Sequence, residues 1–173
     1  MDNRPAVKFF AFLGVLAAPL VGGTAAVGSP PGNDGVLSVK NAEGRVVIVG
    51  RGAVIGRFDK GQVTIKDPNP NDGTGPIVTG ADQTSQLGEK TTRYSGANIR
   101  FRIIGGSFTV TVYGTDVDLS AIGRGLVTLD GSVARGTDDE LGATYAVNGG
   151  ASLPFPTFRL TFPLTPSQAG SGG

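Results

Sequence analysis

The sequence contains no histidine, cysteine or tryptophan, and its single methionine is Met1. Without histidine and cysteine, the common Ser-His-Asp and Cys-His nucleophile systems cannot form. Zinc sites with imidazole or thiolate ligands are excluded, and haem and iron–sulfur ligation are disfavoured for the same reason. Disulfides are excluded as well, so the core alone must hold the fold. We therefore expect a protein that is not an enzyme and that holds no cofactor, with calcium as the one open exception.

The chain also lacks an excess of charge of either sign. Fifteen Lys and Arg residues against fourteen Asp and Glu residues give a net charge of +1. A nearly neutral protein has no overall field that attracts nucleic acid or an anionic membrane. Aromatic residues that could stack on single-stranded nucleic acid are few, with nine Phe and three Tyr. We expect no nucleic-acid partner.

Residues 1–26 have the pattern of a signal peptide. Arg4 and Lys8 give a positive start, residues 9–21 are apolar, and residues 24–26 supply small side chains for cleavage. The apolar run is shorter than a membrane span, although an uncleaved anchor or a buried N-terminal helix stays open. The pattern predicts a secreted or cell-envelope protein whose only membrane contact is an uncleaved leader.

The rest of the chain is rich in glycine, with 29 residues, and in short runs of Val, Ile and Thr. This composition predicts an all-β fold with tight turns. After a linker at 27–35, we expect a single domain over 36–165 and a disordered tail over 166–173. The domain should be an antiparallel β-sandwich or barrel of about ten short strands.

Two segments of this domain give sharper expectations. Residues 98–113 alternate apolar and polar side chains on both sides of Gly105-Gly106, which predicts a β-hairpin with one buried face. Residues 68–96 are polar and contain at most one short strand, at 77–79. Polar loops of this length are often functional, so loop 68–96 is a candidate contact region.

A short phrase occurs twice, as VGRGAV at 49–54 and as IGRGLV at 122–127. The aliphatic-glycine steps at 49–50 and 55–56 fit the hexapeptide β-helix pattern, so a short β-helix or β-roll is the alternative fold. Two hexads are less than one coil, and a turn at 59–61 breaks their phase. We interpret the phrase as paired strand corners, with glycine at the bend and arginine facing water.

Arginines are the candidate ligand-binding residues. Arg51 and Arg124 lie in the two copies of the phrase, and Arg100 and Arg102 share the polar face of one strand. Guanidinium groups bind anionic glycans and phosphates, although arginine is also an ordinary choice for a solvated strand face. Adjacency of Arg51 and Arg124 in space would favour the binding interpretation.

Oxygen-bearing side chains suggest a calcium site at Asp67, Asn69, Asn71 and Asp72. The EF-hand spacing is not met, and Asn, Asp, Pro and Gly are also the usual turn formers. An enzymatic alternative rests on Asp116 and Asp118, which lie two residues apart on one strand. Glycosidases use a pair of carboxylates, which Asp116 and Asp118 could supply, but no tryptophan is present to form a sugar platform.

The runs GRVVIVGRGAVIGRFDKGQVTI at 44–65 and FRIIGGSFTVTVYGTDVDLSAIGRGLVTLDG at 101–131 resemble small secreted β-rich proteins of high-GC Gram-positive bacteria. That group has no assigned activity, so the resemblance implies secretion and a bacterial source and nothing about chemistry. Two functions are expected from the sequence. The first is a non-enzymatic β-domain that binds or packs against an extracellular or envelope partner. The alternative is a calcium- or glycan-binding accessory domain.

Overall fold

The computed structural model describes residues 34–71, 73, 75–134 and 142–166. The predicted signal peptide, almost all of the linker and nearly all of the tail lie outside these residues. The described part is one antiparallel sheet of seven strands that does not close into a barrel. It contains no α-helix, only the 3-10 turn η1 Gly131–Val133. The strands are β1 Gly35–Lys66, β2 Ile77–Thr79, β3 Gln83–Gly88, β4 Thr91–Asp130, β5 Thr144–Val147, β6 Leu153–Pro154 and β7 Arg159–Leu164.

The predicted all-β antiparallel class is confirmed, but the predicted number and length of strands are wrong. β1 has 32 residues and β4 has 40, so two long strands replace most of the short ones. The short strand predicted at 77–79 is confirmed as β2, but the predicted loop 68–96 is too long, because β3 and the start of β4 also lie within it. Within the described residues, no helix is long and apolar enough to cross a membrane.

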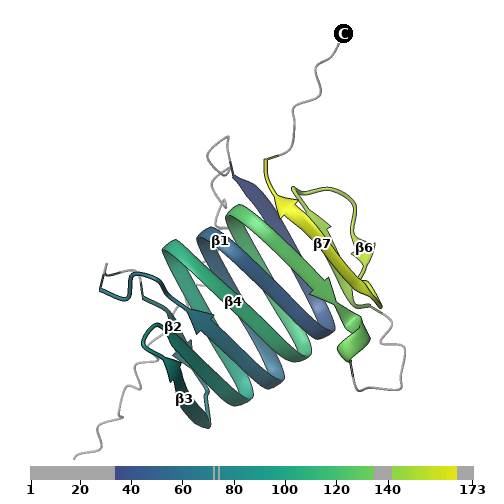
Figure 1. Cartoon of the computed structure of the whole chain (residues 1–173). Coiled ribbons are helices and arrows are strands. Elements are labelled where there is room, and N and C mark those ends of the chain that lie inside the picture. Colours follow the sequence, from purple (N-terminus) through teal and green to yellow (C-terminus); the bar gives the residue numbers. More distant parts are fainter. Residues whose placement is uncertain (1–33, 72, 74, 135–141, 167–173) are drawn as a thin grey trace, which may run out of the picture.

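The two long strands wind around a common axis. Val46 of β1 pairs with Val112 of β4 on one side and with Leu129 on the other, 17 positions further along. Val112 in turn pairs with both Val46 and Val63, again 17 positions apart. A strand that meets the same partner again after 17 residues has made one full turn. Figure 1 shows the result, an antiparallel two-stranded spiral with β2 and β3 at one end and β6 and β7 at the other.

Glycines occupy the corners of the spiral at intervals of eight or nine residues. They are Gly44, Gly52 and Gly61 in β1, and Gly96, Gly105, Gly114 and Gly123 in β4. At Gly61 the φ angle is 147°, and a Cβ atom would lie 2.1 Å from the Tyr113 carbonyl oxygen. Such an approach of two backbones leaves room only for hydrogen at the α-carbon. The glycine period therefore sets where each strand bends.

The predicted hairpin at 98–113 is wrong, although its alternation of side chains is right. Ile103 pairs with Val54 and Phe108 pairs with Gly50, so both flanks of Gly105-Gly106 pair with β1 and not with each other. Two glycines of β4 here stand opposite the single Gly52 of β1, which is the arrangement of a β-bulge. The bulge bends β4 around a corner instead of reversing it.

Between corners, each strand crosses one of two layers, and alternate side chains fill the space between them. Val46 and Ile48 lie in one layer, and Val54 and Phe58 lie in the other; all four are at most 2% exposed. They belong to a single apolar cluster that also receives Phe155 and Leu164 from the C-terminal segment. Complete burial of one such side chain stabilises the fold by about 1.5–3 kcal/mol. The alternation leaves every second residue of the spiral on its outer surface.

Candidate functional site

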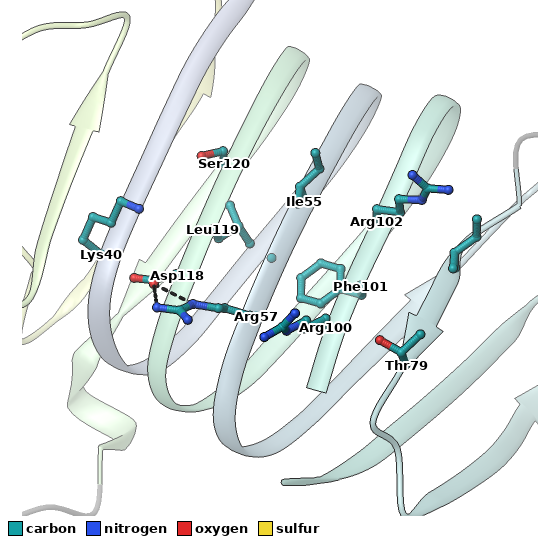
Figure 2. A pocket seen from close by; sticks show the side chains of 12 residues that line it. Lys40, Ile55, Arg57, Thr79, Arg100, Phe101, Arg102, Asp118, Leu119 and Ser120 are labelled. Carbon is teal, nitrogen blue, oxygen red and sulfur yellow. Dashed lines mark hydrogen bonds and ion pairs between the residues drawn. The ribbon is translucent and has the colours of Figure 1, made fainter. Parts of the chain in front are cut away.

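A hollow of about 750 Å³ lies on the outer surface of one layer (Figure 2). Adjacent segments of β1, β4 and β2 line it, so residues far apart in sequence meet there. Its volume falls within the range of small-molecule sites. We call this hollow the basic groove and define it by six outward side chains, Lys40, Ile55, Arg57, Ile77, Arg100 and Arg102.

One acidic residue, Asp118, borders the basic groove and is already engaged. Its Oδ2 accepts hydrogen bonds from Arg57 Nη2 at 2.6 Å and Nε at 2.9 Å, and its Oδ1 accepts one from the Asn41 N–H at 3.1 Å. Burial opposes ionisation of Asp118, but the Asn41 N–H and the Arg57 guanidinium outweigh it and lower the pKa of the carboxyl. The same hydrogen bond raises the pKa of Arg57. Asp118 is therefore an anion that positions Arg57.

The other arginines of the basic groove have no such partner. Arg100 lies directly opposite Arg57 in the register, and Arg102 lies two residues further along β4. Among the described residues, neither Arg100 nor Arg102 forms an ion pair. Like charges directly opposite on neighbouring strands destabilise a sheet. The basic groove thus keeps an uncompensated positive charge that an anion would relieve.

The predicted corner pair forms a second basic region. Arg51 and Arg124 are direct cross-strand partners, and Gly52 pairs with Gly123 beside them, as paired strand corners require. Two hollows of about 480 and 580 Å³ share these arginines, and neither includes Arg100 or Arg102. Arg124 Nε lies 3.2 Å from Asp34 Oδ1, so part of the charge is balanced. The four predicted arginines therefore form two separate pairs.

The predicted calcium ligands lie in the turn after β1. Asp67 Oδ1 accepts a hydrogen bond from the Asn69 N–H at 2.9 Å, which is an Asx-type turn. Asn71 is exposed, and Asp72 lies outside the described residues. The described residues contain no cluster of three or more acidic side chains that could hold a metal. The calcium site is thus a prediction from the sequence that the described residues do not support.

Calcium binding can be tested by thermal unfolding. A metal that binds only the native state raises the melting temperature, by an amount that grows with its concentration. Because one oxygen of Asp67 already accepts a hydrogen bond within a turn, we expect equal melting temperatures in EDTA and in about 1 mM calcium. This concentration is about 100 times the Kd of a typical calcium sensor. An increase of several degrees with calcium, but not with magnesium, would contradict this expectation and restore the calcium site.

No family model, curated protein or solved structure matches this chain. The resemblance to secreted bacterial proteins and the signal peptide therefore stay predictions. The basic groove and the two arginine pairs are the features that bear on function.

Proposed function

We propose that this protein is a non-enzymatic binding domain that acts outside the cytoplasm and holds an anionic ligand in the basic groove. The observation that carries the proposal is the position of Arg100 and Arg102. Both side chains are exposed, both line a hollow of about 750 Å³, and neither forms an ion pair with a described acid.

The spacing of the arginines suits an anion with several oxygens. Neighbouring strands lie about 4.8 Å apart, so the backbones of Arg57 and Arg100 are adjacent, while the Arg57 guanidinium turns toward Asp118 (Figure 2). Arg102 stands about 7 Å further along the same strand face. The guanidiniums of Arg100 and Arg102 can each donate two parallel hydrogen bonds to a carboxylate, sulfate or phosphate. Lys40 adds a further positive charge at the far side of the basic groove.

The acids near the basic groove support a binding role over catalysis. A general acid needs a raised pKa, whereas the pKa of Asp118 is lowered by its hydrogen bonds. Asp116, its predicted partner, sits at a corner with a φ of 50°. The sequence offers no histidine or cysteine to replace them. Action outside the cytoplasm is supported by the signal-peptide pattern of residues 1–26.

Titration calorimetry with tripolyphosphate tests this proposal. The double variant Arg100→Gln/Arg102→Gln removes two charge-assisted donors, so we expect binding at least about ten-fold weaker than in the wild type. The double variant Arg51→Gln/Arg124→Gln removes the same charge from the corner pair and should change affinity by less than about three-fold.

A charge control completes the experiment. The double variant Lys60→Gln/Lys90→Gln removes two exposed cations outside the basic groove. It should reproduce only the general electrostatic effect, which weakens as salt screens the charges. An equal loss in all three double variants would mean that net charge alone attracts the probe. A loss confined to the Arg51 and Arg124 variant would move the site to the corner pair.

A further inference from the structure

Three exposed isoleucines surround Arg102 on the outer surface. In the register, Ile55 of β1 and Ile77 of β2 lie directly opposite Arg102, one on each side. Ile104 follows two residues later on the same face of β4. Their exposed fractions are 60% for Ile55, 49% for Ile77 and 58% for Ile104. We call these three residues the isoleucine cluster.

This arrangement is unusual for a solvated strand face. Single exposed apolar residues are ordinary, but several that adjoin in a hollow mark a binding surface. Ile55 and Ile77 line the hollow, whereas Ile104 lies outside its lining. Diagonal neighbours on adjacent strands lie within about 8 Å, so Ile104 continues the apolar surface from Ile55. The aliphatic stem of Arg102 can pack between them while its guanidinium stays in water. Ile55 and Ile77 therefore adjoin Arg100 and Arg102 within the basic groove.

We infer that the basic groove binds a single-chain amphiphile with an anionic headgroup. This inference rests on the proposed function and adds the chemical class of the ligand. Arg100 and Arg102 would hold the headgroup, and the isoleucine cluster would cover the first part of the apolar chain. A small polar anion would leave the isoleucines in water, whereas an amphiphile matches both surfaces. The hollow of about 750 Å³ has a volume in the range of single-ligand sites.

The test compares three probes by calorimetry, each below its micellar concentration. Decyl phosphate carries both the headgroup and the chain, ethyl phosphate carries the same headgroup with a short chain, and decyltrimethylammonium carries the chain with the opposite charge. Because each buried methylene adds to affinity, decyl phosphate should bind at least about ten-fold more tightly than ethyl phosphate. Decyltrimethylammonium should not bind measurably.

Matched serine variants show where the alkyl chain of the ligand binds. Ile55→Ser/Ile77→Ser should weaken decyl phosphate at least about five-fold and leave tripolyphosphate unchanged. The control Val49→Ser/Leu126→Ser removes a cross-strand pair of similarly exposed residues, 47% and 53%, outside the basic groove. It should bind decyl phosphate like the wild type. If the Ile→Ser variant does not fold, Ile→Thr at both positions keeps the β-branched shape and replaces it.

The outcomes separate this inference from the proposed function. Arginine-dependent binding of tripolyphosphate with equal affinities for decyl and ethyl phosphate would overturn the amphiphile and leave the anion site standing. Binding to anionic lipid vesicles without binding to monomeric decyl phosphate would also overturn it, since the surface would then contact a membrane. Failure of every anion to bind would remove both.

Discussion

Replacing Gly61 by alanine should destabilise the protein by more than about 3 kcal/mol, because two effects act together. The φ angle of 147° is one that side chains rarely adopt, and the new Cβ would lie 2.1 Å from the Tyr113 oxygen and 2.7 Å from the Gly114 α-carbon. Both obstacles are backbone of the neighbouring turn of the spiral, which cannot move without shifting the corner. Urea unfolding followed by circular dichroism measures the loss.

The control for this substitution is Gly88→Ala at the end of β3. A Cβ atom at Gly88 meets no heavy atom within 4 Å. Its stability should stay within about 0.5 kcal/mol of the wild type. Equal unfolding midpoints for the Gly61 and Gly88 variants would show that the corners tolerate side chains, and would contradict the account of the spiral given above.

Replacing Asp130 by asparagine should cost about 2 kcal/mol of unfolding free energy, since it removes a buried charge that three groups stabilise. The carboxylate is only 3% exposed. It accepts a hydrogen bond from Ser132, and its Oδ2 lies 3.2 Å from Arg45 Nη2 and 3.4 Å from Arg159 Nε. The control is Asp59→Asn, which makes the same substitution at an exposed position that lacks these partners. Its unfolding free energy should differ from the wild type by less than about 0.5 kcal/mol.

The same residue predicts a dependence of stability on pH. The Ser132 hydrogen bond, aided by Arg45 and Arg159, outweighs burial and lowers the pKa of Asp130. A carboxyl with a lowered pKa stabilises the fold above its unfolded pKa of about 4, and this stability is lost as the pH falls through the folded value. Asp118 acts in the same direction. The free energy of unfolding should therefore fall below about pH 5, and less steeply in Asp130→Asn than in the wild type. Parallel curves for the two proteins would contradict this assignment.

The alternation of side chains was predictable from the sequence, because it depends only on the two-residue period of a strand. Ile99, Phe101 and Ile103 are buried, while Arg100 and Arg102 are exposed, as their order indicates. The winding was not predictable in this way. A glycine pair at a strand bend looks the same in sequence as one at a hairpin turn, and only the distant partners of its two flanks distinguish them.

The candidate site was likewise predictable in part from the sequence. Arginines on polar strand faces can be read from the chain, and the repeated phrase indicated two strand corners; that Arg51 and Arg124 are partners comes from the register. Asp118 pairs with Arg57, while Arg100 and Arg102 form no ion pair among the described residues. This difference depends on a strand register between residues more than 40 positions apart in sequence. The isoleucine cluster has the same origin, since Ile55, Ile77 and Ile104 adjoin only through pairing among β1, β2 and β4.

The spiral also determines when this protein can fold. Within the β1–β4 ladder, the partners closest in sequence are Lys66 and Thr91, 25 positions apart, and Gly35 pairs with Gly123, 88 positions away. Chains dominated by such distant pairings fold slowly, because the entropy of closing long loops is lost before the contacts form. All strand partners of β1 lie in β4 and β5, so β1 has no partner strand until β4 has been synthesised. Folding is thus a late event that follows the synthesis of most of the chain.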